Sequence, residues 1–305
     1  MKRLLWWLVL FSFALALTVT LSAQEVALTF DDLPAHGPVP QGLSRVEIIK
    51  SILKDLKAAH APQVYGFINA GKLEQEPADL EVLKLWRAAG FPLGNHTYTH
   101  PSLNKISAKD FEQNIEKNEA ELKSLMDGKD WHWLRYPFLD EGDTVEKRRE
   151  VRAYLKNHGY RIAQVTLDFQ DWAWNDPYAR CVEKKDDKSI EQLKKMYVDT
   201  ASEFLDLDPK LAKLVYGRDI KHVLLLHVGA FETVMLPRLM ELLKQRGYKL
   251  ITLPEAESDE AYKSDPDVVL TEGGTLLEQM IVAKHLQQMP QHAPVPITEL
   301  QAMCH

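Results

Sequence analysis

The 305-residue chain has few cysteines, no excess of positive charge and, beyond its first two dozen residues, no long apolar run. Lysine and arginine number 37 against 44 aspartates and glutamates, so the surface has no reason to bind nucleic acid. No internal repeat and no glycine-rich phosphate loop is visible, so the usual sequence signature of a nucleotide site is missing. No feature indicates an obligate protein partner.

The only two cysteines are Cys181 and Cys304. In an exported chain the pair would be able to form one disulfide, because disulfides persist in oxidising compartments. Two free or buried thiols remain the alternative, since sequence alone does not bring the two residues together.

The N-terminus predicts a secretory signal peptide over residues 1–23. Met1-Lys2-Arg3 is followed by an apolar block and then by small residues that end at Ala23. The chain is therefore expected to be exported to the periplasm or the extracellular space. An N-terminal membrane anchor stays open, because the apolar and hydroxyl run extends to Leu21 and approaches the length of a membrane span.

Residues 24–257 alternate between short strand-like and amphipathic helix-like segments. Strands are predicted at 25–30, 63–68, 91–95, 131–136, 160–167, 222–226 and 248–253. Helices are predicted at 44–56, 77–89, 107–125, 144–158, 189–205 and 231–246. This alternation predicts an α/β fold with a mostly parallel sheet, and about seven units favour a closed or nearly closed (β/α) barrel.

Two other regions are less regular. Residues 175–187 are polar and charged and are predicted to form an excursion between the fifth strand and its helix. Residues 258–305 are predicted to be a partly helical C-terminal extension, with one helix at 275–287 and no structure predicted after residue 290.

Polar residues that are costly to bury recur where the predicted strands end. In parallel barrels these ends share one mouth, where active sites are built, so we expect one site there. The residues concerned are Asp31, Asp32, His96, His100, Arg135, Pro137, Asp168, Asp171, Trp172 and His227.

His96 and His100 are four residues apart and follow an apolar run. This spacing is able to turn two imidazoles toward one point, as zinc-type metals require. The pair differs from the zincin helix motif because Thr97, not glutamate, follows His96. Taken alone, the pair is more typical of surface or capping histidines in a threonine-rich turn, because short histidine motifs recur by chance.

Five short motifs in order give the chain a family resemblance. They are Thr29-Phe30-Asp31-Asp32, His96-Thr97-Tyr98-Thr99-His100, Arg135-Tyr136-Pro137-Phe138, Asp171-Trp172 and Leu224-Leu225-Leu226-His227. Over residues 25–253 the chain resembles the polysaccharide deacetylases with a NodB-homology domain, carbohydrate esterase family 4. That resemblance implies a distorted (β/α) barrel and one divalent metal ion, with zinc as the first choice and cobalt, nickel or manganese as alternatives.

The resemblance also implies roles for individual residues. Asp32, His96 and His100 would bind the metal. Asp31 would be the general base, oriented by Arg135. His227 would be the general acid, with Asp171 behind it to raise its pKa.

Four further residues are expected to bind substrate. Trp172 and Leu225 would form apolar walls, although plain core packing explains them equally well. By the same resemblance, Tyr98 would donate its amide to the oxyanion, and Pro137 would lie at the rim. The first motif departs from the family pattern, because Leu33-Pro34 replaces the usual glycine and places His36 close to the site.

These expectations combine into one functional prediction. The chain is expected to be a secreted, metal-dependent enzyme that removes N-acetyl groups from an amino-sugar polymer or oligomer, chitin-like or peptidoglycan. The alternatives are an O-acetyl polysaccharide esterase, a small-amide hydrolase, and an inactive protein that only binds glycan. The expected partner is an acetylated glycan.

Overall fold

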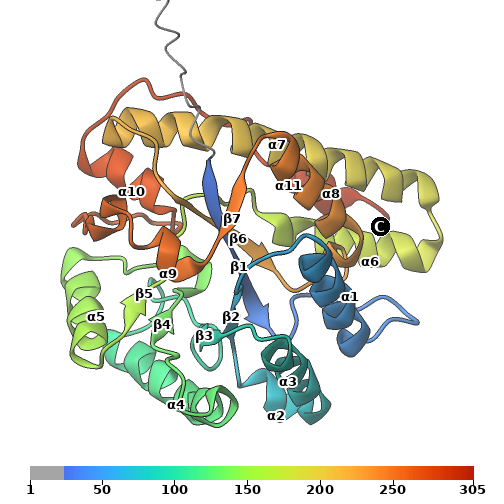
Figure 1. Cartoon of the computed structure of the whole chain (residues 1–305), viewed down its shortest axis with the longest axis horizontal. Helices are drawn as coiled ribbons and strands as arrows, with labels where there is room; N and C mark the ends of the chain where they lie inside the picture. Colours follow the sequence, from blue (N-terminus) through green and yellow to red (C-terminus); the bar gives the residue numbers. More distant parts are fainter. Residues whose placement is uncertain (1–23) are drawn as a thin grey trace, which may run out of the picture.

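A computed structural model describes residues 24–305, and these residues form one parallel sheet surrounded by helices (Figure 1). The strand order is β5-β4-β3-β2-β1-β6, and β7 also pairs with β1. All pairs are parallel. The strands are β1 (Glu25–Leu33), β2 (Tyr65–Ile68), β3 (Leu93–Asn95), β4 (Trp133–Leu134), β5 (Arg161–Ile162), β6 (His222–His227) and β7 (Lys249–Ile251).

The sheet curls around β1, its longest strand. Residues Val26–Asp31 of β1 pair with β6. The strand β2 pairs with Thr29–Leu33 of β1, and β7 pairs with Glu25–Ala27. A parallel bridge between Leu167 and Leu224 joins the segment after β5 to β6. The predicted distorted barrel of about seven strands is therefore confirmed as a curled half-barrel that this bridge partly closes. Residues 160–167, predicted as one strand, pair regularly only at β5.

Helices cover the outside of the sheet. Their apolar faces make the core. In α1, for example, Ile48, Ile49, Ile52 and Leu56 are buried, and the Ser44 side chain caps the first turn. The helices are α1 (Arg45–Ala58), α2 (Lys72–Gln75), α3 (Leu80–Ala88), α4 (Ala108–Met126), α5 (Val145–Asn157), α6 (Asn175–Lys184), α7 (Asp187–Tyr216), α8 (Glu232–Gln245), α9 (Leu253–Ala256), α10 (Leu276–Ala283) and α11 (Ile297–Ala302).

Residues 175–187, predicted to form an excursion between the fifth strand and its helix, are helical. The segment forms α6 and the start of α7, and Pro177, Ala179 and Cys181 of α6 are buried. α7 also runs past its predicted end to Tyr216 despite Pro209, because Leu211, Ala212 and Val215 continue its buried stripe.

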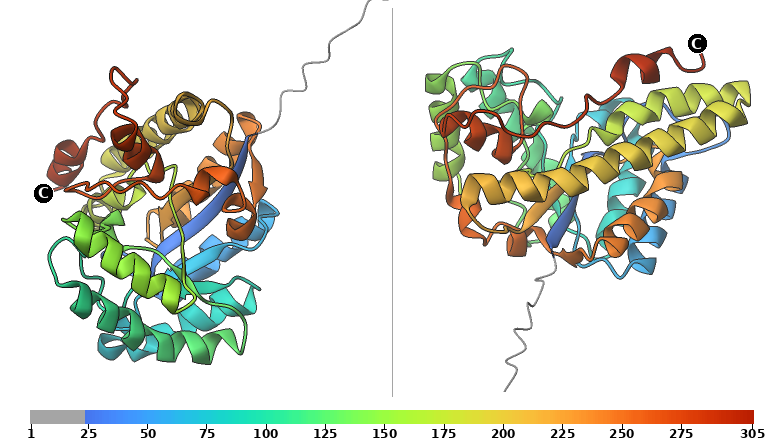
Figure 2. Two further views of the ribbon diagram at one scale, coloured as in Figure 1. Left: turned by 90° about the vertical axis from the view of Figure 1, so that its left-hand side faces the viewer. Right: turned by 90° about the horizontal axis from the view of Figure 1, so that it is seen from above.

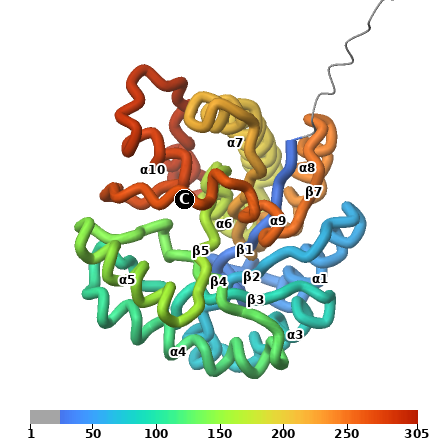
Figure 3. Tube along the Cα trace, turned by 60° about the vertical axis from the view of Figure 1, so that its left-hand side comes forward, coloured from blue at the N-terminus to red at the C-terminus, as the bar shows by residue number. Residues whose placement is uncertain are grey.

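The C-terminal extension folds back over the barrel. α10 packs against α7, and α11 packs against α6, so the segment follows α7 and ends beside α6 (Figures 2 and 3). A disulfide joins Cys181 in α6 to Cys304. Residues 290–305, for which no structure was predicted, therefore contain α11 and a covalent attachment.

Loss of this disulfide is expected to lower the free energy of unfolding. The bond closes a loop between residues 123 apart, and such cross-links typically contribute about 2–4 kcal/mol by restricting the unfolded chain. Denaturant titration of Cys304→Ser should show that loss. Non-reducing peptide mapping should recover one peptide pair containing both cysteines, and two freely alkylated thiols would contradict the assignment.

The predicted signal peptide, residues 1–23, lies outside the described residues. Within residues 24–305, no helix combines the length and the apolar character needed to cross a membrane.

Candidate active site

Seven of the ten predicted strand-end residues line one cavity of about 520 Å³, and Arg135, Pro137 and Asp171 do not. Asp31 and Asp32 come from β1, His96 follows β3 directly, and His227 ends β6. The cavity is lined by Asp31, Asp32, His36, His96, His100, Tyr136, Phe138, Leu139, Asp168, Gln170, Trp172, Leu225, His227 and Glu272. The carboxyl ends of parallel strands thus bring together residues that lie far apart in sequence.

Asp32, His96 and His100 form a group that is able to hold a metal ion. One ligand atom from each residue lies within 4.8 Å of the other two, and the two imidazole Nε2 atoms are 3.2 Å apart. Two imidazoles and one carboxylate are a donor set that suits zinc and related divalent metals. Asp32 and His100 have positive φ angles of 67° and 59°, a costly backbone conformation that often accompanies functional sites.

Both histidines are in the form that a metal ligand requires. Nδ1 of His96 lies 2.8 Å from the carbonyl oxygen of Arg135, which only accepts, so Nδ1 carries the proton and Nε2 keeps its lone pair. Burial lowers the pKa of His96 well below its usual value and that of His100 to about 4. The rings are therefore neutral at pH 7 and available to a metal.

Asp32 is held by two basic side chains. The Lys72 ammonium lies 3.1 Å from Asp32 Oδ1 and donates to the Asp32 carbonyl oxygen at 3.0 Å, and His36 Nδ1 lies 2.7 Å from Oδ2. Burial works against ionisation, but Lys72 and His36 outweigh it and keep the pKa of Asp32 well below its usual range. Asp32 therefore stays ionised. The sequence drew attention to His36 but not to Lys72, which belongs to no motif.

Asp31 is paired with a buried arginine. Arg135 Nη1 lies 3.2 Å from both Asp31 carboxylate oxygens, and the guanidinium is fixed by the Ala163 carbonyl oxygen and the Thr29 hydroxyl. Burial raises the pKa of Asp31 to about 6, although Arg135 limits the rise. A carboxylate with a pKa near neutrality is suited to exchanging a proton during catalysis.

His227 is oriented by Asp171. The Asp171 carboxylate accepts from the His227 amide at 2.8 Å, and its other oxygen lies 2.8 Å from Nδ1. Nε2 is left as the ring nitrogen available to the cavity. Burial opposes the charged imidazole, but Asp171 raises the pKa of His227 to about 9. His227 therefore carries a proton at neutral pH.

The four predicted substrate contacts are placed differently from one another. Trp172 and Leu225 line the cavity, and the Trp172 side chain is exposed. Pro137 is buried and does not border the cavity. The Tyr98 prediction is wrong, because its amide already donates to the Asn114 carbonyl oxygen and its hydroxyl donates to Glu74, away from the cavity.

The structure adds residues to the cavity that had no predicted role. Phe138 is 61% exposed, and its ring centroid lies 4.5 Å from that of His100. Glu272 reaches the cavity from the C-terminal extension, 45 residues beyond His227, where the last motif ends. Nothing in its local sequence marks it, because only the fold returns this segment to the site.

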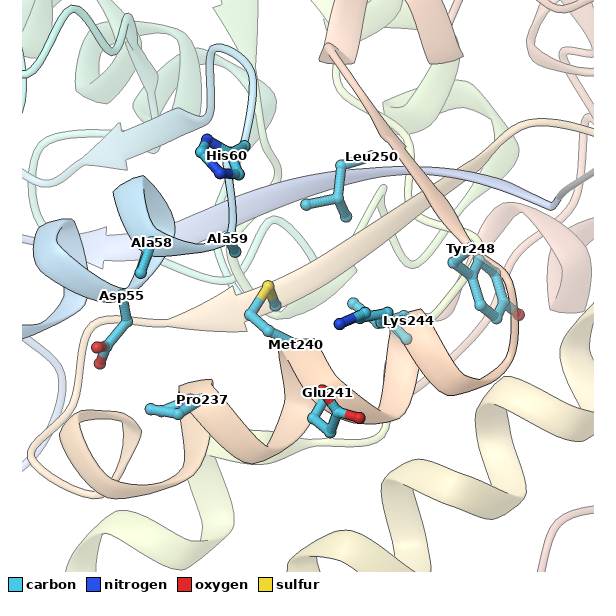
Figure 4. A pocket seen from close by; sticks show the side chains of 11 residues that line it. Asp55, Ala58, Ala59, His60, Pro237, Met240, Glu241, Lys244, Tyr248 and Leu250 are labelled. Carbon is cyan, nitrogen blue, oxygen red and sulfur yellow. The ribbon is translucent and has the colours of Figure 1, made fainter.

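A separate cavity, of about 480 Å³, lies between α1, α8 and β7 (Figure 4). It is lined by the C-terminal end of α1 and the beginning of β7, which lie at the opposite end of the barrel from the strand-end residues. It shares no residue with the first cavity. The chemistry therefore concentrates at the other end of the barrel.

Comparison with known proteins agrees with this geometry. Residues 18–163 match the family model described as polysaccharide deacetylase. Just under half of the chain is therefore similar to the polysaccharide deacetylases. The matched part includes both aspartates of β1, both histidines of the candidate metal site and Arg135, whereas Asp171 and His227 lie beyond it.

Two curated relatives resemble about half of this chain. A chitin deacetylase from Arthroderma benhamiae is 28% identical over 152 residues, which are 50% of this chain and 36% of the relative. A peptidoglycan-N-acetylglucosamine deacetylase from Bacillus cereus is 28% identical over 160 residues, 52% of this chain and 50% of the relative. The chain thus spans between about a third and a half of these relatives' length.

A solved structure supports the fold. The chitin deacetylase from the fungal pathogen Colletotrichum lindemuthianum superposes with a TM-score of 0.53 at 22% identity. The match covers 83% of this chain and 93% of that protein. The resemblance to carbohydrate esterase family 4 noted from the motifs is therefore confirmed for the fold.

Proposed function

We propose that this chain is an exported, metal-dependent deacetylase that hydrolyses N-acetyl groups of an amino-sugar polysaccharide or oligosaccharide. One observation carries the proposal: Asp32, His96 and His100 lie in the same cavity as Asp31 and His227, two groups suited to opposite proton transfers. The relatives named chitin deacetylase and peptidoglycan-N-acetylglucosamine deacetylase support this substrate class.

The proposed cofactor is one divalent ion, with zinc as the first choice. The two-imidazole, one-carboxylate donor set supports it, and the ionised Asp32 and neutral histidines are ready to bind. When bound, such an ion supplies Lewis acidity toward the acetyl carbonyl group and toward water.

Two residues of the chain, Asp31 and His227, then carry out one proton transfer each. A water oxygen attacks the acetyl carbon, and Asp31 accepts the proton that this water loses. His227 gives its proton to the sugar nitrogen as the carbon–nitrogen bond breaks, which yields acetate and a free amine. Because an amide nitrogen must be protonated to leave, the protonated His227 supports amide hydrolysis in particular.

Export is part of the same proposal. The basic and apolar start of the chain is typical of a signal peptide, and the Cys181–Cys304 disulfide fits an oxidising compartment. A periplasmic or extracellular location would also place the chain beside cell-wall and matrix glycans.

Acetate release from a substrate panel tests the proposal. Purified mature protein should release acetate from chitooligosaccharides or from peptidoglycan. Acetate from acetylxylan alone would identify an O-acetyl esterase instead. Glycan binding without acetate release from any substrate would identify a binding protein and contradict the proposal.

Asp171→Asn is expected to move the alkaline limb of the pH–rate profile to lower pH. In the wild type, His227 loses its proton as the pH rises through about 9, so the acid form is lost above that value. Removing the negative charge lowers the pKa of His227. The alkaline decline of kcat/KM should therefore occur at a pH at least about one unit lower than in the wild type. The measurement is kcat/KM against pH, with the exposed Asp176→Asn as control. An unchanged alkaline limb would contradict the role of Asp171.

A further inference from the structure

The catalytic cavity adjoins a second cavity, of about 610 Å³. Its far wall is built by α7 and by residues 272–295 of the C-terminal extension, including α10, which packs against α7 (Figure 3). The residues that border both cavities are Phe138, Leu139, Asp168, Gln170 and Glu272. A molecule held at the metal-ligating residues therefore lies next to the second cavity.

The exposed aromatic ring of Phe138 lies between the two cavities. Phe138 borders both cavities, and one side of its ring is supported by His100. Aromatic rings of this kind commonly pack against the apolar face of a sugar. Both cavities have volumes within the range of ligand pockets, so each has room for a sugar unit.

The charge on the shared wall is of one sign. Neither cavity is lined by lysine or arginine, whereas Asp168 and Glu272 border both. Within residues 24–305, neither carboxylate forms an ion pair. Deeper in the second cavity, Asp208 is already paired with His292, and Glu278 caps α10. Burial raises the pKa of Asp168 to about 7, so Asp168 is ionised only in part at neutral pH and Glu272 is the main carboxylate of this wall. The shared wall therefore disfavours carboxylate-bearing glycans and accepts neutral or ammonium-bearing ones.

We propose that the C-terminal extension builds a subsite for the neighbouring sugar of the substrate chain, and that this subsite selects uncharged or ammonium-bearing amino sugars. The inference rests on the proposed deacetylase function and narrows its substrate to chitin-like chains. Peptidoglycan, whose muramic units and peptides carry carboxylates, is disfavoured at the same wall. The extension is thus a specificity element of the active site.

Substitution of Ala293, an exposed residue that lines the second cavity, tests the subsite. In the wild type, kcat/KM for acetate release should be at least about 10-fold higher for chitotetraose than for chitobiose, equivalent to about 1.4 kcal/mol from the added contacts. Ala293→Trp fills the cavity and should reduce that ratio to about one. Ala58→Trp, at the exposed alanine that lines the cavity in Figure 4, is the matched control and should keep the wild-type ratio.

Glu272→Gln tests the charge selection. The wild type should favour chitotetraose over a peptidoglycan oligomer of similar length by at least about 10-fold in kcat/KM, and the variant should narrow this preference severalfold. Glu81→Gln, an exposed carboxylate in α3, should leave the preference unchanged.

Equal kcat/KM for chitobiose and chitotetraose in the wild type would overturn the subsite. The same would follow if Ala293→Trp kept the full chain-length ratio. A wild-type preference for the peptidoglycan oligomer would overturn the charge selection. Failure of the underlying function looks different, because the wild type would then release no acetate from the chitin oligomers or from the peptidoglycan oligomer.

Discussion

Asp31→Asn is expected to retain the metal and lose the reaction, whereas Asp32→Asn should lose both. Asp32 offers its carboxylate to the same point as His96 and His100, so its amide variant weakens the ion's ligand set. Asp31 is paired with Arg135 instead, and its amide variant removes only the proton acceptor. The rate of Asp31→Asn should fall by about 10²–10⁴-fold, a range typical of general base removal.

Metal analysis and acetate release on the same protein samples separate the two outcomes. Asp31→Asn should keep one ion per chain and still bind substrate, while Asp32→Asn should lose most of the ion. If Asp31→Asn lost the metal and Asp32→Asn kept it, the roles of the two aspartates would be exchanged.

His96→Ala and His100→Ala should each remove most of the bound metal. Changing partners of metal ligands commonly costs 10–100-fold in affinity, so loss of a direct ligand should weaken binding by at least about 100-fold. His60→Ala, an exposed histidine at the opposite end of the barrel, should bind metal as the wild type does.

Calorimetric titration with zinc gives the affinity directly, and circular dichroism checks that the variants remain folded. A His96→Ala protein that binds one zinc ion with wild-type affinity would contradict the ligand assignment.

Local patterns were sufficient to predict most of the barrel. Most strands are short apolar runs, and helices such as α1, α4 and α5 begin at a side-chain cap and carry a buried stripe. Because parallel strands share one direction, the residues at their carboxyl ends were expected to meet, and Asp31, His96 and His227 do line one cavity. These residues could be predicted as site residues because each is a polar side chain, costly to bury, that directly follows an apolar run.

The remaining features depend on contacts between distant segments. Lys72 lies on a four-residue helix without a motif, and only the fold brings its ammonium to Asp32. Glu272 reaches the cavity because the C-terminal extension returns along α7. The Tyr98 contact failed for a local reason that sequence does not reveal, since its amide is taken by the Asn114 carbonyl. Contacts of this kind produce no periodic pattern in the sequence, so they could not be predicted from it.

Stepwise metal restoration tests the central claim most directly. Chelator-treated protein should release no acetate from chitotetraose, and zinc should restore the rate in proportion to the amount added, up to one ion per chain. Chelator-treated, metal-free protein that still released acetate at the untreated rate would contradict a metal-dependent deacetylase centred on Asp32, His96 and His100.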